Sequence, residues 1–163
     1  MKTLLILRHA KSSSKQPETT DHDRPLNARG KRDAPRMGQL VLNEDLTPDL
    51  IISSTAKRAR HTAQMIARTC GYERTVLEVS TLYHAGPDMW LTVLRNLPET
   101  CKRPMIVGHN PGLEDLLRVL TGTDRPLPTA ALAQVDADIS EWSSLQPDQS
   151  ARCVCLWLPR ELA

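Results

Sequence analysis

Short apolar runs alternate along this chain with segments of helical periodicity, and this alternation constrains the fold more than any other feature. The apolar runs cover residues 2–7, 50–53, 75–79 and 105–108. Helical patterns follow them over residues 28–42, 56–69, 87–97 and 111–120. Strands that alternate with helices pair in parallel within one sheet. We therefore predict a single α/β domain over residues 1–163, with three α/β/α layers and a mostly parallel sheet.

Local signals refine the expected bounds of these elements. Pro35 lies inside the first helical segment, where it is expected to cause a kink or an early break. Thr55 is placed to cap the second helix, and Gly71 is placed to end it. Residues 132–136 and 153–158 are predicted as two further strands. We expect that the C-terminal strand can run antiparallel to the rest of the sheet.

Composition and charge exclude several classes of protein. Twenty-one Lys and Arg residues against nineteen acids give a formal net charge of +2, so we expect no nucleic-acid partner. No apolar stretch approaches the roughly 20 residues that span a bilayer, and the N-terminus lacks a signal-peptide pattern. We therefore expect a cytoplasmic protein without a membrane partner. The oligomeric state stays open.

Metal and cofactor signatures are weak in this sequence. The pair Cys153-x-Cys155 has no matching second pair, so it is a poor zinc signature, and packing in a strand is the favoured interpretation. The sequence also has no GxxxxGK[ST] loop and no HExxH helix. We expect no metal and no cofactor.

Two histidines stand at the ends of apolar runs. Arg8 and His9 directly follow the first run, and His109 directly follows the fourth. Arg58 lies in the first turns of the helix after the second run. Ligands bind at the carboxyl ends of parallel strands, and helix N-termini favour anions there. Two imidazoles and two guanidiniums at one such edge predict a phosphoryl site.

A neutral histidine in this setting can act as a nucleophile. Its ring nitrogen attacks phosphorus and forms a phosphohistidine, which divides one difficult transfer into two easier ones. Nearby arginines disfavour protonation of the ring of His9. Their positive charges also stabilise the negative charge on the equatorial oxygens in the transition state. This chemistry requires no metal.

These residues, in this order, resemble the histidine phosphatase superfamily, whose hallmark is an Arg-His pair after the first strand. The resemblance is to the small phosphohistidine phosphatases of the SixA type, and it runs from Met1 to about Leu158. The blocks that carry it are Leu7-Arg8-His9, Asp23-Arg24-Pro25-Leu26, Arg29-Gly30, Ser53-Ser54, Arg58-Ala59, Thr62, Leu82-Tyr83 and Gly108-His109-Asn110-Pro111. The implied fold is phosphoglycerate mutase-like, without a large cap insertion.

The resemblance implies specific roles. His9 is the nucleophile that becomes phosphorylated, Arg8 and Arg58 bind the phosphoryl oxygens, and His109 completes the pocket and stabilises the transition state. Arg24 lies on the polar loop 12–27, which is expected to fold over the site, and is a predicted substrate contact.

Three further residues complete the predicted substrate-binding set. Lys11 and Ser12 follow the nucleophile closely enough to donate hydrogen bonds to phosphate. Asn110 follows His109 at the start of the next helix.

Two departures from the larger members bear on the substrate. Ala10 stands where they carry glycine, and residues 82–86 contain no carboxylate where many of them place a glutamate acid. A leaving alkoxide needs a proton donor, whereas the imidazole of a phosphoramidate can take its proton from solvent. The missing acid favours phosphohistidine, with His84, Asp88 or solvent left as the proton source.

The expected function is therefore metal-independent hydrolysis of phosphohistidine on a protein, such as a histidine-containing phosphotransfer domain involved in signal transduction. An open site without a cap suits a side chain of another protein. Two alternatives stay open: a small-metabolite phosphomonoesterase, which needs an acid, and a catalytically silent phosphate-binding regulatory module, which forms no phosphoenzyme.

Overall fold

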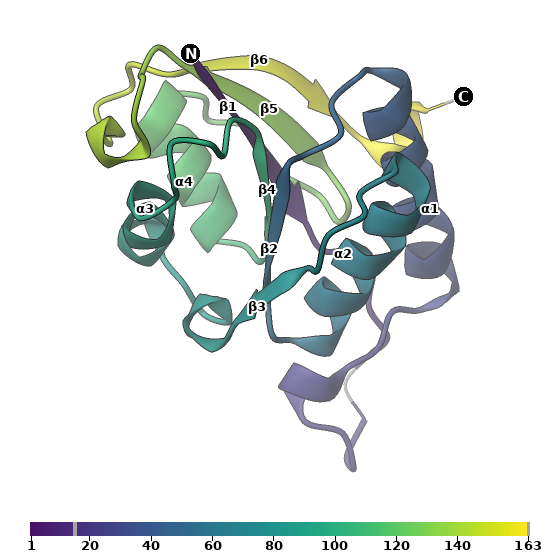
Figure 1. Ribbon diagram of the computed structural model, residues 1–163. Coiled ribbons are helices and arrows are strands. Elements are labelled where there is room, and N and C mark those ends of the chain that lie inside the picture. Colours follow the sequence, from purple (N-terminus) through teal and green to yellow (C-terminus); the bar gives the residue numbers. More distant parts are fainter. Residues whose placement is uncertain (15, 163) are drawn as a thin grey trace.

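One six-stranded sheet lies between two pairs of helices in the computed structural model, which describes residues 1–14 and 16–162 (Figure 1). The strands are β1 (Lys2–Arg8), β2 (Leu50–Ser54), β3 (Leu77–Val79), β4 (Pro104–Gly108), β5 (Leu132–Ala137) and β6 (Arg152–Trp157). The helices are α1 (Ala28–Asn43), α2 (Lys57–Cys70), α3 (Pro87–Arg95) and α4 (Gly112–Thr121). Short 3-10 turns span Asp21–Asp23, Ser80–Leu82, Trp142–Ser144 and Pro159–Glu161.

The strand order β3-β2-β4-β1-β5-β6 confirms the predicted, mostly parallel sheet. Strands β1 to β4 run parallel to their neighbours among themselves, and β5 pairs antiparallel with β1. The C-terminal strand β6 pairs antiparallel with β5, so it points in the same direction as β1. The strand that runs against the others is therefore β5, one element earlier than expected.

The central strand β1 is buried on both faces. Its apolar residues are consecutive, and successive side chains point to opposite faces of the sheet, so both faces are apolar. Leu5 and Leu7 pack with the α1 and α2 side of the sheet. Leu4 and Ile6 pack with the α3 and α4 side. Burial of each such side chain contributes about 1.5–3 kcal/mol. This packing on both faces fixes the position of the carboxyl end of β1.

The early break considered at Pro35 does not occur, and the cap expected from Thr55 is wrong. Pro35 does not end α1, which is continuous to Asn43, because the helix buries Met37 and Val41 in the core beyond it. That burial outweighs the loss of one backbone hydrogen bond. Thr55 does not cap α2: its hydroxyl lies 2.9 Å from Nε2 of His22, and the N-cap residue Ala56 makes no side-chain cap.

Strand β3 is shorter than the predicted range 75–79. It lies at the edge of the sheet and pairs only with β2. The carbonyl of Thr75 accepts a hydrogen bond from the Tyr72 hydroxyl (3.0 Å).

Among the described residues, no helix is both long and apolar enough to cross a membrane.

The start of α4 lies directly against the turn that precedes α3. A Cβ atom on Gly112 would clash with the backbone carbonyl oxygen of Ala85, and no side-chain rotation can relieve such a contact. A Cβ atom on Gly86, in the same turn, would meet nothing within 4 Å. Of these two positions, close approach of backbone to backbone therefore requires glycine at 112 and not at 86.

We predict that Gly112→Ala lowers the free energy of unfolding by about 1–3 kcal/mol, because the turn must move away from α4. The matched variant Gly86→Ser places a favoured N-cap residue at the start of α3 and is expected to stay within about 0.5 kcal/mol of wild type. Urea unfolding followed by circular dichroism measures both. Equal unfolding midpoints for the two variants would contradict the close contact.

Candidate active site

His9 is the first residue after β1, at the carboxyl edge of the sheet. Its backbone N–H donates to the carbonyl of Gly108 (3.1 Å), which ties the ends of β1 and β4 together. Its side chain is buried, and Nδ1 lies 2.8 Å from the carbonyl oxygen of Ala10. A carbonyl oxygen only accepts, so Nδ1 carries the ring proton. The lone pair of the neutral ring is therefore on Nε2.

The surroundings of His9 keep this ring neutral. Burial lowers its pKa from the ordinary 6.5 to about 4, and the charges of Arg58, Arg8 and Arg24 act in the same direction. The hydrogen bond to the carbonyl of Ala10 opposes this shift. At neutral pH, Nε2 is an unprotonated nitrogen close to several cationic groups.

His109 follows β4 and faces His9 across the edge of the sheet. The two ring centroids are 5.1 Å apart, with an interplanar angle of 53°. Nε2 of His109 lies 2.8 Å from the hydroxyl of Ser54, at the end of β2. Burial lowers the pKa of His109 to about 3, with contributions from His9 and Arg58. The structure therefore brings the two predicted histidines into one site.

Arg8 and Arg58 lie at the same site. The Arg58 side chain is buried and donates from Nη1 to the backbone oxygen of Asp21 (2.7 Å). Arg8 donates from Nη1 to the carbonyl of Leu127 (3.1 Å). Burial lowers the pKa of Arg8, and the charge of Arg58 contributes to this shift, whereas the carboxylate of Glu114 opposes it. The two guanidiniums are thus close enough to repel each other.

Unsatisfied polar atoms gather at this site. Six buried side-chain nitrogen or oxygen atoms of the described residues have no hydrogen-bond partner. Four of them belong to the predicted set: Nε of Arg8, Nε of Arg58, Nδ1 of His109 and Oδ1 of Asn110. Buried polar groups are almost always paired in folded proteins, so a group of exceptions points to function.

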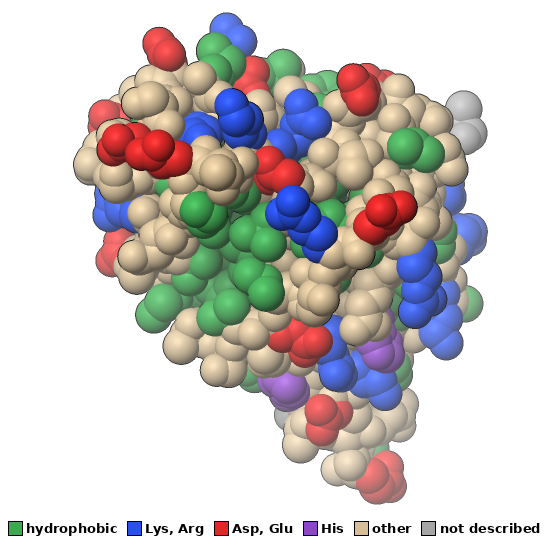
Figure 2. All heavy atoms as spheres, in the orientation of Figure 1, with side chains coloured by type: hydrophobic (Ala, Val, Ile, Leu, Met, Phe, Trp, Pro, Cys, Tyr) green, Lys and Arg blue, Asp and Glu red, His purple; other side chains and the backbone are tan. Residues whose placement is uncertain are grey.

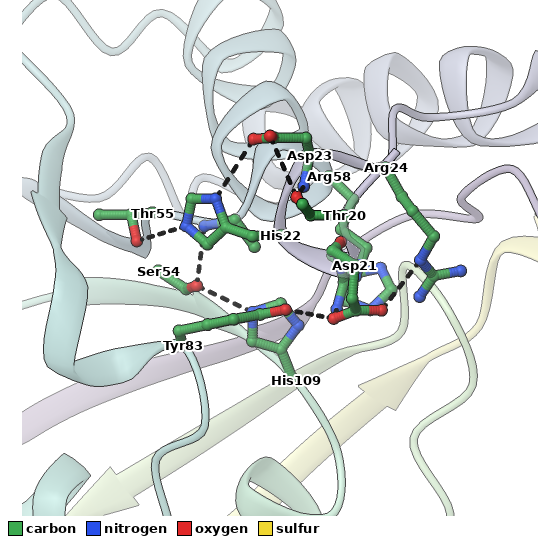
Figure 3. A network of polar contacts seen from close by, with 12 residues as sticks. Thr20, Asp21, His22, Asp23, Arg24, Ser54, Thr55, Arg58, Tyr83 and His109 are labelled. Atoms are coloured by element: carbon green, nitrogen blue, oxygen red, sulfur yellow. Dashed lines mark hydrogen bonds and ion pairs between the residues drawn. The ribbon is translucent and has the colours of Figure 1, made fainter. Parts of the chain in front are cut away.

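Asp21 joins the loop to the site, and sequence reasoning did not single it out (Figure 3). Its carboxylate accepts hydrogen bonds from Nη2 of Arg58 (3.2 Å), from Nε of Arg24 (3.0 Å) and from the Tyr83 hydroxyl. The bond from Tyr83 is the main cause that lowers the pKa of Asp21 to about 2, and the two arginines add to it. Asp21 lies three residues before the predicted contact Arg24, and this spacing is the signal in the sequence that could have identified it.

The predicted substrate contacts divide into two groups. Arg24 lies near enough to His9 to lower its pKa, and Asn110 donates to the carbonyl of Leu127 (2.8 Å) beside the site. Lys11 is exposed, and Ser12 forms a backbone bridge with Leu26 across the loop. Contact of any of these four residues with substrate stays a prediction.

A small pocket opens beside His109. Its volume is about 270 Å³, and it is lined by Tyr83, His84, Ala85, Gly86, His109, Asn110, Pro111, Gly112 and Asp115. The ring of Tyr83 stacks on His84, with centroids 3.9 Å apart, and meets the ring of His109 edge-on. Asp88 is exposed at the start of α3, outside this lining. Of the two side chains considered as acids, His84 is the one at the pocket.

The described residues contain no group of three His, Cys, Asp or Glu side chains that could hold a metal ion. His22, which stands between two aspartates, instead connects the loop to the start of α2. Its Nε2 lies 2.9 Å from the Thr55 hydroxyl, and its Nδ1 lies 3.4 Å from a carboxylate oxygen of Asp23.

Comparison with known proteins identifies relatives over nearly the whole chain. The family model of the histidine phosphatase superfamily (branch 1) matches residues 4–81. An uncharacterised chloroplast protein of Arabidopsis thaliana is 33% identical over 148 residues, which cover 85% of this chain and 68% of that protein. An uncharacterised protein of Mycobacterium tuberculosis is 30% identical over 157 residues, which cover 89% of this chain and 95% of that protein.

Solved structures give the same result. The proposed phosphohistidine phosphatase SixA from Agrobacterium tumefaciens is 30% identical, with a TM-score of 0.83 over 97% of this chain and 98% of that one. The protein histidine phosphatase SixA in complex with tungstate has a TM-score of 0.84 at 18% identity, over 99% of each chain. The second likeness is one of fold alone.

The family model covers the segment that contributes Arg8, His9 and Arg58. The structure from Agrobacterium tumefaciens extends the likeness through His109 to the C-terminal strands, without a large insertion in either chain. The fold is accordingly the phosphoglycerate mutase-like fold expected from the sequence. The chain therefore belongs to the histidine phosphatase superfamily and is a phosphatase of the SixA type.

Proposed function

We propose that this phosphatase removes phosphate from phosphohistidine on a protein, such as a histidine-containing phosphotransfer domain, through an intermediate on His9. The observation that carries the proposal is the state of the His9 ring. It is neutral, with its proton on Nδ1, and its free Nε2 belongs to the same buried cluster as Arg8 and Arg58. A nucleophilic imidazole in the field of two guanidiniums is suited to phosphoryl transfer.

The reaction has two steps. In the first, Nε2 of His9 attacks phosphorus, and the bond between phosphorus and the substrate nitrogen breaks. The positive charges of Arg8 and Arg58 stabilise the negative charge that spreads over the equatorial oxygens. In the second, water attacks the phosphohistidine of the enzyme, orthophosphate leaves and the Nε2 lone pair is restored.

His109 contributes a hydrogen-bond donor in this proposal. The hydroxyl oxygen of Ser54 accepts from the backbone N–H of Ala56 (3.2 Å), and its own proton is available for Nε2 of His109 (2.8 Å). The ring proton of a neutral His109 then resides on Nδ1, a buried atom without a protein partner. This N–H is the group that donates to a phosphoryl oxygen.

The leaving group is expected to be an imidazole because, within residues 1–14 and 16–162, no carboxylic acid is positioned to protonate an alkoxide. Asp21 has a pKa of about 2 and is ionised. Asp115, at the pocket, is held by an ion pair with Nη2 of Arg118 (2.7 Å). The pocket of about 270 Å³ is also slightly smaller than the roughly 300–1,000 Å³ typical of small-ligand sites.

We propose that the reaction takes place in the cytoplasm, which is a reducing compartment. All four cysteines are free thiols, which is typical of proteins kept in such a compartment. Signal transduction through phosphotransfer domains takes place there.

The first prediction concerns the substrate. Wild-type enzyme is expected to hydrolyse a phosphohistidine-bearing phosphotransfer domain with a kcat/KM at least about 100-fold higher than that for sugar phosphates, because general acid catalysis contributes 10² or more to ester hydrolysis. His9→Ala is expected to lose at least about 10³-fold of this activity. Phosphate release measures turnover, and an alkaline quench, which preserves the bond between phosphorus and nitrogen, traps the labelled enzyme.

One control variant tests the site, and two possible outcomes would favour the alternative functions. His61→Ala, a histidine outside the site, should keep the wild-type rate with p-nitrophenyl phosphate, whose leaving group needs no acid. Faster turnover of sugar phosphates, lost in His84→Ala or Asp88→Asn, would instead identify a metabolite phosphomonoesterase. Absence of both phosphate release and a trapped phosphoenzyme would identify a silent binding module.

The second prediction concerns pH. An unperturbed histidine with a pKa of 6.5 is about 90% protonated at pH 5.5. His9, with a pKa of about 4, is expected to remain neutral there, with its proton on Nδ1. Imidazole ¹⁵N NMR between pH 7.5 and 4.5 measures both properties, and His9→Ala assigns the signals. A midpoint near 6.5 for folded His9 would refute the neutral nucleophile.

The same shift sets the sign of a stability effect. The unfolded chain binds a proton at this ring near pH 6.5, and the folded chain binds it near pH 4. The contribution of His9 to folding is therefore complete above about pH 6.5 and declines as pH falls toward 4.

A further inference from the structure

Positive charge is concentrated in one helical layer of the molecule. Helices α1 and α2 together carry eight lysines and arginines and one acid, whereas α3 and α4 carry two basic and three acidic residues. The whole chain has a formal net charge of only +2. Figure 2 shows Lys and Arg side chains gathered over α1 and α2, at the right of the view. The protein therefore has one markedly basic face.

The placement of these charges opposes the stability of the helices themselves. A helix N-terminus carries a partial positive charge and favours acidic side chains. Helices α3 and α4 follow this rule, with acids in their first turns and arginines in their last. Helices α1 and α2 have no acid in the first turn. The first turn of α2 instead contains Lys57, Arg58 and Arg60, and only Arg58 belongs to the site.

Four cations from the two helices form a basic patch around His61: Lys31, Lys57, Arg60 and Arg68. Burial lowers the pKa of His61, and each of these four charges contributes in the same direction. Arg60 pairs weakly with Glu78 (3.8 Å). In the part of the chain that the structure describes, the other three cations have no carboxylate within 4 Å. Much of the charge on the patch is thus uncompensated.

The basic patch lies next to the active site. Lys57 and Arg60 occupy the same turn of α2 as Arg58, whose guanidinium bonds to Asp21 in the site. An anionic surface that reaches over this turn meets both the patch and the phosphoryl-binding arginine. Apart from the imidazole of His61, neither α1 nor α2 contains an aromatic ring on which a nucleic-acid base could stack. The chemistry of the patch is therefore suited to carboxylates.

We propose that the basic patch binds an acidic segment of the phosphoprotein substrate while its phosphohistidine enters the site. This inference rests on the proposed function, because it assigns the partner of the same site. Exposed ion pairs are individually weak, but several in parallel steer and retain a complementary partner. The patch then selects among phosphohistidine proteins by the charge of the surface around the phosphorylated residue.

The test uses two labelled peptides of equal length that carry a hydrolysis-resistant phosphonate analogue of phosphohistidine, flanked by glutamates in one and by serines in the other. Fluorescence anisotropy with the full-length protein gives the Kd of each. The acidic peptide is expected to bind at least tenfold more tightly, and 500 mM NaCl should remove the difference. The double variant Lys31→Glu, Lys57→Glu should also remove it, while hydrolysis of p-nitrophenyl phosphate stays within twofold of wild type.

Lys102→Glu provides the matched charge reversal, because Lys102 is exposed and precedes β4 at the opposite edge of the sheet. It should leave the preference for the acidic peptide unchanged. Equal Kd values for the two peptides, or absence of binding by both, would overturn the inference. Equal competition by a single-stranded oligouridylate would overturn the assignment to a protein partner. Selective binding of the acidic peptide, without hydrolysis of authentic phosphohistidine, would support the patch and refute the proposed function.

Discussion

The site depends on the burial of two guanidiniums at the end of the sheet: that of Arg58 is buried, and that of Arg8 is half-buried. Each is costly to remove from water, and burial is the main cause that lowers the pKa of Arg8. The fold offsets this cost with acids from two different elements. Asp21 bonds to Arg58 from the loop, and Glu114 of α4 opposes the shift in the pKa of Arg8. Burial lowers the pKa of His9, and the charges of these two arginines add to that shift.

The sequence was sufficient to predict the parts of this arrangement that follow from regular structure. Strands β1 and β4 are neighbours, and their register pairs Arg8 with Gly108. The next residue on each strand is a histidine, so the two rings must lie side by side. Continuous apolar runs defined both strands because each is buried on both faces. Their carboxyl ends could therefore be located without knowledge of any side-chain contact.

Contacts of the irregular segments could not be predicted in this way. Asp21 meets Arg58 across 37 positions of sequence, through a loop that has no periodicity. Thr55 fits the pattern of a helix cap, but its hydroxyl contacts His22 of that loop instead. Pro35 follows a local rule that the burial of Met37 and Val41 overrides. In each case a long-range contact decided the outcome, and local propensity carried no information about it.

The carboxylate of Asp21 also has a consequence for turnover. It is ionised at neutral pH, and it accepts a hydrogen bond from the guanidinium that the proposed mechanism assigns to the phosphoryl group. An incoming phosphoryl group must share Arg58 with this internal competitor. Free orthophosphate, which has no attached polypeptide to add further contacts, is disadvantaged most. If the proposed reaction takes place at this site, the loop is therefore expected to lower the affinity for the product.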